Sequence, residues 1–205
     1  MLNARTVAMI GSHPDDIEVG CGGTIKRFLN SGKNVYCIIC SKGGKSGSPE
    51  VKMQELYTSL EKLGMKKEIV YILNLEDSMI SDGPITIGVI EEVLNRVKPE
   101  IIFFTPPHDR HQDHRNVSNA TLVAARNLKS SILFYETVSA SVTFAPKIFV
   151  DISETVDSKL EALKCYKNLN EKTLDFISTT AKFRGHQANA EYAEGFEVNK
   201  AFYNI

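Results

Sequence analysis

The sequence has no long apolar run, no excess of charge of either sign, and no tryptophan. No stretch approaches the roughly 20 apolar residues that span a bilayer, so no membrane-spanning helix is expected. The 205 residues carry 24 Lys and Arg against 25 Asp and Glu, a formal net charge of -1. Because nucleic acids and anionic membranes usually select a basic surface, we expect neither as a partner.

The sequence also lacks the marks of a targeting leader and of a domain linker. Its first apolar segment, residues 7–10, is too short for the apolar part of a signal peptide, and no cleavage site follows it. We therefore expect a cytoplasmic protein. No run of Pro, Gly and Ser is long enough to separate two domains, so residues 1–205 are expected to form a single domain.

Cysteine is scarce, and the one CxxC pair lies in an apolar segment. Two of the four cysteines, Cys37 and Cys40, fall within residues 35–40, which are typical of a buried strand. Residues three apart on a strand point to opposite faces, so the two sulfurs would diverge. We expect them to be small buried hydrophobic side chains and not a zinc or redox pair.

Short apolar runs alternate with helical patterns along the chain. Strands are expected at residues 6–10, 35–40, 69–73, 101–105, 132–135 and 148–152, and helices at residues 23–30, 49–63, 86–97, 113–128 and 153–168. Several of the strands are continuous and β-branched, as in sheets covered on both faces. The alternation predicts an α/β fold: a three-layer α/β/α sandwich around a Rossmann-like, mainly parallel sheet.

A glycine-rich loop, residues 41–48, follows the second expected strand. Ligands in open α/β sheets usually bind at such strand ends. The loop resembles part of a phosphate-binding loop, but the full spacing requires glycine five residues before Gly44, where the chain has Ile39. Nucleotide binding is therefore not expected.

Two short motifs concentrate residues that can bind metals or move protons. The first, His13-Pro14-Asp15-Asp16, follows the first expected strand. Pro14 stiffens the turn and keeps His13 out of helical geometry. Adjacent aspartates point apart, so one could bind a metal while the other faces a water molecule, and the spacing does not decide which does which.

The second motif, residues 106–114, follows the fourth expected strand and contains His108, His111, Asp113 and His114. Because both motifs follow parallel strands, they can converge at the C-terminal ends of the sheet. Two imidazoles and one carboxylate are typical of a catalytic zinc site with one open position. A further carboxylate could act as general base and a further imidazole could stabilise an oxyanion. Either motif alone could equally be a capping or surface feature; the pair favours a site.

These residues resemble the LmbE/PIG-L-like family of metal-dependent deacetylases. The resemblance rests on His13-Pro14-Asp15-Asp16, on the glycines at 20, 22 and 23 followed by Thr24, and on His111-x-Asp113-His114. Weaker matches extend over most of the chain, at Glu55, Asp77 and residues 149–152, 159–163 and 192–196. The family implies an enzyme that hydrolyses N-acyl groups, mostly acetyl, from amino sugars and their conjugates with one Zn²⁺ per chain.

Carried over to this sequence, the resemblance implies a role for each motif residue. His13, Asp16 and His114 would be the metal ligands, and Asp15 the general base. His111 would stabilise the oxyanion or protonate the departing amine, with Asp113 orienting it. A homo-oligomer is expected because assembly is common in the family. Iron or cobalt would also suit two histidines and one aspartate.

Other residues are candidates for substrate contacts. Lys52 stands where many members have arginine, which changes a planar two-pronged donor into a point charge. Two further departures are Ile17, in place of a glutamate, and Asn168-Leu169, in place of Ser-Gln. Arg184 and His186 could also lie at the mouth of the site, although a surface or supporting role is the simpler interpretation for His186. His108 could be a spare ligand or a residue at the rim of the site, and we favour the rim.

Two other functions fit the same residues. A metal-dependent phosphoesterase would use paired carboxylates and histidines to hold two metals, whereas the motifs provide ligands for one. A catalytically silent sugar-binding protein would be expected to lack the base or a ligand, and here every such position is filled. The substrate expected is a small amino-sugar amide.

Overall fold

The computed structural model describes residues 4–45 and 47–202, so Ser46 of the glycine-rich loop lies outside the described chain, as do residues 1–3 and 203–205. Its strands are β1 (Thr6–Gly11), β2 (Asn34–Ser41), β3 (Val70–Leu75), β4 (Ile101–Phe104), β5 (Ser131–Tyr135), β6 (Ile148–Asp151) and β7 (Ala193–Lys200). Its helices are α1 (Asp16–Asn30), α2 (Pro49–Leu63), α3 (Pro84–Val97), α4 (Gln112–Ala124), α5 (Val156–Leu163) and α6 (Glu171–Gln187), with a 3-10 turn at Lys67–Ile69.

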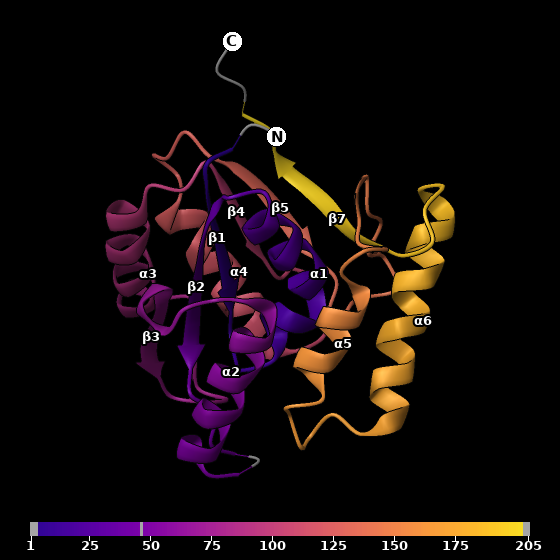
Figure 1. Cartoon of the computed structure of the whole chain (residues 1–205). Helices are drawn as coiled ribbons and strands as arrows, with labels where there is room; N and C mark the ends of the chain where they lie inside the picture. The colour runs from indigo at the N-terminus through magenta and orange to yellow at the C-terminus, as the bar shows by residue number, and fades with distance from the viewer. Residues whose placement is uncertain (1–3, 46, 203–205) are drawn as a thin grey trace.

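The strands form one sheet in the order β3-β2-β1-β4-β5-β7-β6. The five strands from β3 to β5 pair in parallel, and β7 runs antiparallel between β5 and β6. The C-terminal ends of the parallel strands therefore meet at one edge of the sheet, the lower edge in Figure 1. The predicted mainly parallel α/β fold is confirmed.

Helices cover both faces of the sheet. Helices α1, α2 and α5 pack together on one face, α3 and α4 cover the other, and α6 lies beside β7 and β6 (Figure 1). The two layers enclose separate apolar clusters: Cys37 contributes to the cluster under α1, and Cys40 to the cluster under α3 and α4. Both cysteines are buried free thiols, as predicted from the strand alternation.

Helix α1 begins at Asp16, seven residues earlier than the sequence predicts. The early turns contain glycines, which weaken a helix, but close packing requires them. A side chain at Gly20 would overlap the ring of Tyr135, and a Cβ at Gly23 would lie 2.7 Å from Ile152 Cβ. The glycines therefore let the start of α1 approach the sheet directly after the first motif.

Helix α6 and strand β7 are not predicted from the sequence. The helix expected at residues 153–168 is longer than α5, which spans Val156–Leu163. Helix α6 buries only Ile177, Ala181 and Gly185, a narrow stripe that carries little apolar signal. Strand β7 contains the buried Glu194, which accepts hydrogen bonds from the backbone N–H groups of α1 and pairs with Lys159 of α5 at 2.6 Å. This tertiary pairing compensates for a charge that would otherwise disfavour a buried strand.

No helix among the described residues is both long enough and apolar enough to span a membrane.

Candidate metal centre

The first motif forms the tight turn between β1 and α1. The backbone N–H of His13 donates to Asp16 Oδ2 at 2.8 Å, which closes the turn over the start of the helix. Asp15 has a φ of 94°, in the left-handed region that a residue with a side chain rarely occupies. The turn thus directs Asp15 and Asp16 differently: the carboxylate of Asp16 faces the histidines and that of Asp15 contacts Asn168.

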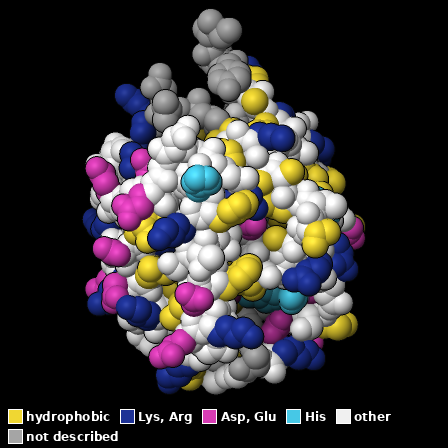
Figure 2. All heavy atoms as spheres, turned by 90° about the vertical axis from the view of Figure 1, so that its right-hand side faces the viewer, with side chains coloured by type: hydrophobic (Ala, Val, Ile, Leu, Met, Phe, Trp, Pro, Cys, Tyr) yellow, Lys and Arg dark blue, Asp and Glu magenta, His cyan; other side chains and the backbone are white. Residues whose placement is uncertain are grey.

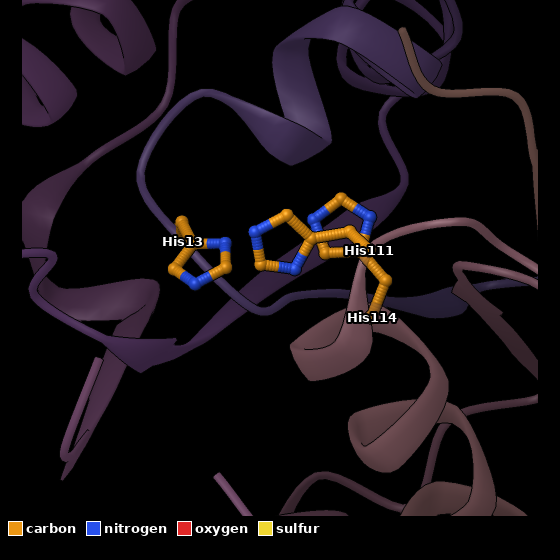
Figure 3. Close-up of side chains that lie close together, drawn as sticks. All are labelled: His13, His111 and His114. Carbon is orange, nitrogen blue, oxygen red and sulfur yellow. The ribbon is translucent and has the colours of Figure 1, made fainter. Parts of the chain in front are cut away.

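The second motif forms the start of α4. The imidazole Nδ1 of His111 accepts the backbone N–H of Asp113 at 3.2 Å, so His111 caps the helix. His114 lies in the first turn and is 4% exposed. Figure 3 shows both rings directed towards His13, although the two motifs lie about a hundred residues apart. The ring centroids of His111 and His114 are 4.6 Å apart, and that of His13 is 5.0 and 5.6 Å from them.

The three residues predicted as ligands meet around the carboxylate of Asp16. His114 Nε2 lies 3.2 Å from Asp16 Oδ1, and His13 Nδ1 lies 3.6 Å from Asp16 Oδ2. Nitrogen atoms of His13, His111 and His114 also lie within 4.8 Å of one another. Two imidazoles and a carboxylate at this spacing can hold one divalent ion, with His111 beside it.

In His13 and His114, the nitrogen that faces away from Asp16 is held by acceptors. His13 Nε2 contacts Asp113 Oδ2 at 3.0 Å and Asp77 Oδ1 at 3.3 Å. His114 Nδ1 contacts Asp109 Oδ1 at 3.4 Å and Ser139 Oγ at 3.3 Å. Since a carboxylate only accepts, these contacts keep the protons on the outer nitrogens. The inner nitrogens, His13 Nδ1 and His114 Nε2, face Asp16 and would turn their lone pairs to a bound metal, a geometry common in metal sites.

His13, Asp77 and Asp113 form a second group with ligand atoms within 4.8 Å of one another. This group uses the nitrogen of His13 that donates to the carboxylates, and it shares His13 with the first group. The two groups therefore suit one metal ion and its supporting acceptors better than two ions.

The position of Asp113 differs from the predicted one. The sequence predicts that the Asp113 side chain orients His111, but its Oδ2 contacts His13 and accepts the backbone N–H of Ser78 at 2.8 Å. The backbone of Asp113, and not its carboxylate, holds His111. The reason is local: a side chain in the first turn of α4 projects towards the loop after β3, while the capping ring lies over the helix end.

The electrostatics of the site favour a bound cation. Burial lowers the pKa of both His13 and His114, yet the carboxylates outweigh it: Asp113 and Asp16 raise the pKa of His13 to about 10, and Asp16 and Asp109 raise that of His114 to about 9. The pKa of Asp16 is well below its usual range despite burial, because both histidines contact it. The same negative potential would stabilise a divalent metal, so the donor set fits one.

Asp15 and His111 have pKa shifts that suit proton transfer and hydrogen bonding. Burial and the neighbouring charge of Asp16 raise the pKa of Asp15 to about 7, against the opposing effects of Asn168 and Lys52. Burial and the charges of His114 and His13 lower the pKa of His111. A neutral His111 whose Nδ1 accepts a hydrogen bond carries its proton on Nε2, so it can donate to a substrate oxygen.

The four predicted substrate contacts differ in their surroundings. Lys52 is 9% exposed, and its stem passes beneath Gly43 of the glycine-rich loop. Arg184 forms a two-pronged pair with Glu136, at 2.7 and 2.9 Å, and His108 pairs with Glu197 at 3.3 Å. His186 is exposed at the end of α6, outside the histidine group. Of the four, only Lys52 influences the charge of Asp15.

A hollow of about 450 Å³ adjoins the centre on its β2–β3 side. It is lined by Ser41–Lys45, Pro49 and Asn74–Asp77. Asp77 belongs to both the hollow and the histidine centre, because its Oδ1 contacts His13 and its Oδ2 accepts the backbone N–H of Lys45 at 2.9 Å. On the face shown in Figure 2, histidine side chains are visible in a recess bordered by hydrophobic, basic and acidic groups. The hollow beside Asp77 has polar and apolar walls and is roomy enough for a sugar ring.

Three supporting residues are not among those predicted from the sequence. Asp109 is 1% exposed, accepts from Thr137 and Ser139 at 2.6 and 2.7 Å, and has a pKa of about 2 because these contacts and His114 outweigh burial. Asp109 could have been predicted from the sequence, because its carboxylate lies between His108 and His111 in the second motif. Ser139 and Thr137 follow β5, and nothing in the local sequence marks them.

The model of the family described as "PIG-L: GlcNAc-PI de-N-acetylase" matches residues 8–125, which include both motifs. The chain belongs to the PIG-L family. This confirms the resemblance to LmbE/PIG-L-like deacetylases.

Relatives in sequence and a solved structure agree with the family assignment. The chain is 33% identical over 176 residues to the uncharacterized deacetylase YaiS of Escherichia coli, covering 80% of this chain and 91% of YaiS. It is 27% identical to diacetylchitobiose deacetylase of Thermococcus kodakarensis, covering 94% and 82%. The structure of N,N'-diacetylchitobiose deacetylase from Pyrococcus horikoshii superposes with a TM-score of 0.83 at 25% identity, covering 96% and 84%.

Proposed function

We propose that this protein is a zinc-dependent N-deacetylase that releases acetate from an N-acetylated amino sugar or a small N-acetylglucosaminyl conjugate. The enzyme class follows from the family and from relatives that are deacetylases. The observation that carries the metal-dependent mechanism is the convergence of His13, Asp16 and His114, with their inner nitrogens facing one carboxylate.

These three residues would hold the metal, and Asp15 and His111 would act on the substrate. A divalent metal bound there supplies a Lewis acid for an amide carbonyl and for water. Asp15 takes a proton from the attacking water through its carboxylate. With a pKa raised to about 7, it is a stronger base than an ordinary aspartate and is still deprotonated in part of the population near neutral pH.

His111 donates its Nε2 proton as a hydrogen bond to the carbonyl oxygen as negative charge develops there. A neutral donor held by the end of α4 is already oriented, so it needs no rearrangement during the reaction. The proton that Asp15 receives is then available to the departing amine. The carbon–nitrogen bond breaks, and acetate and the free amine are the products.

The hollow beside Asp77 would accommodate the sugar, with the acetamido group directed at His13 and His111. Among the predicted substrate contacts, Lys52 lies beneath the glycine-rich loop, and its charge lowers the pKa of Asp15. Arg184, His108 and His186 remain predicted substrate contacts at the rim of the site. A homo-oligomer and a cytoplasmic location also remain predictions. Light scattering on the purified protein measures its oligomeric state, and fractionation of cells determines its location.

Replacing Asp15 tests the proposed mechanism. We expect Asp15→Asn to lower kcat by about 10²- to 10⁴-fold, since the amide cannot accept the water proton, while the protein keeps one zinc ion per chain. Metal analysis and acetate release on the same preparation measure both.

Asp16→Asn is the matched control, because the neighbouring carboxylate is assigned to the metal. It should lose zinc as well as activity. Full turnover by Asp15→Asn with zinc retained would exclude Asp15 as the base. Two zinc ions per chain together with phosphate release would favour a phosphoesterase instead.

A further inference from the structure

Asp15 occupies the N-cap position of α1 without acting as a cap. An N-cap aspartate usually accepts a backbone N–H of the first turn, but within the described chain the Asp15 side chain makes no such bond. Its backbone is held at a φ of 94° and a ψ of -30°. The turn thus keeps the carboxylate away from its own helix and available to another partner.

That partner is Asn168, in the connection between α5 and α6. Asn168 Nδ2 donates to Asp15 Oδ2 at 2.8 Å, across 153 residues of sequence. An amide donor occupies one carboxylate oxygen and leaves the other to face a water molecule. It is also neutral, so it orients the carboxylate with a smaller effect on its basicity than a lysine or arginine would have.

The connection that carries Asn168 is anchored on both sides. Before it, Tyr166 is 1% exposed and its hydroxyl donates to Glu18 Oε1 at 2.6 Å, in the first turn of α1. After it, Asn170 caps α6 by accepting the backbone N–H of Thr173 at 3.0 Å. Asn168 is itself exposed, but these neighbours restrict its position, so its amide is presented to Asp15 by fixed backbone.

We propose that Asn168 is a positioning residue for Asp15: it holds the carboxylate in the orientation from which it takes the water proton. The proposal rests on the proposed function, because it gives Asn168 a role in the same reaction. Asn168 contributes neither charge nor a metal ligand. Its loss should therefore slow the chemical step and leave metal and substrate binding unchanged.

The test compares kcat and KM of wild type and Asn168→Ala on an N-acetylglucosamine conjugate that the wild type hydrolyses. We expect kcat to fall about 10- to 100-fold, as for other residues that orient an active-site group, with KM within twofold and zinc content unchanged. Unchanged kcat, or a KM that rises by the whole factor, would overturn the proposal.

Two neighbours in the same connection serve as controls. Lys167→Ala removes an exposed side chain and should change neither constant. Asn170→Ala removes the cap of α6 but leaves the Asn168 amide in place, so it should lower the urea midpoint of unfolding and reduce kcat by much less than Asn168→Ala does. If Asn170→Ala lowers kcat as much as Asn168→Ala, the effect comes from loosening the connection, and the proposal is wrong.

A second readout uses the metal-free protein and needs no activity. The urea midpoints of Asn168→Ala, Asp15→Ala and the double variant form a cycle. Because each single change removes the same hydrogen bond, we expect the double shift to be smaller than the sum of the single shifts. Additive shifts would show that the two side chains do not interact.

Wild type that releases no acetate would refute the proposed function, whereas active wild type with inactive Asp15→Asn and fully active Asn168→Ala would refute this proposal alone.

Discussion

At the scale of residues, the same few side chains have structural and chemical tasks that can be separated. His111 is the clearest case, because its Nδ1 caps α4 while its Nε2 is assigned to the substrate oxygen. Asparagine is a preferred capping residue but its amide is shorter than an imidazole. Replacing His111 by alanine or by asparagine therefore distinguishes the two tasks.

We expect His111→Ala and His111→Asn both to lower kcat by about 10²- to 10³-fold, the typical cost of losing an oxyanion donor. Only His111→Ala should lose stability, by about 1 kcal/mol in the free energy of unfolding, because the side-chain oxygen introduced by His111→Asn can still accept the backbone N–H of Asp113. Urea unfolding of the metal-free proteins and steady-state kinetics measure the two effects. Near-wild-type kcat in His111→Asn would contradict the catalytic assignment.

The residues of the two motifs could be predicted from the sequence, but their partners could not. His13, Asp16 and His114 are recognisable because histidine and aspartate cluster at strand ends. Asn168 and Ser139 are brought to the site by the tertiary fold. The carboxylate of Asp113 faces His13 because Asp113 lies in the first turn of α4. Local sequence fixes neither kind of contact.

At the scale of elements, the position of α1 determines whether the site forms. The helix starts at Asp16, a proposed metal ligand, and its first turns lie against Tyr135, whose hydroxyl donates to the carbonyl of Ile10 in β1 at 2.8 Å. Glycine at position 20 permits this approach. A larger residue there must push the helix or the ring aside.

We expect Gly20→Ala to destabilise the protein by about 1–3 kcal/mol, the usual cost of overpacking, and to weaken zinc binding because Asp16 moves with α1. Gly88→Ala in α3 is the matched control, since a Cβ at Gly88 meets nothing within 4 Å. It should stabilise the protein by about 0.5–1 kcal/mol, because alanine favours a helix interior over glycine. Urea unfolding and zinc titration measure these changes, and equal effects of the two substitutions would disprove the packing argument.

Elements with a strong periodic pattern were predictable and those held by tertiary contacts were not. Helix α2 has an N-terminal proline, an apolar stripe and a C-terminal glycine, and its bounds match the predicted residues 49–63. Strand β7 has a buried glutamate whose partners come from α1 and α5. No alternation of apolar and polar residues could reveal it.

At the scale of the whole molecule, the sheet brings the two motifs together and leaves an open hollow beside them. β1 and β4 are parallel neighbours, so the loops that follow them share one edge of the sheet. The near-neutral charge of the chain is compatible with a small sugar amide as substrate. We therefore expect one reaction at one metal.

Acetate release from a panel of N-acetylglucosamine compounds, with and without a chelator, tests that claim most directly. We predict equal amounts of acetate and free amine from at least one compound, loss of both products with the chelator, and recovery when Zn²⁺ is restored. Acetate release that is unaffected by complete removal of the metal, or none from any compound by zinc-loaded protein, would contradict it.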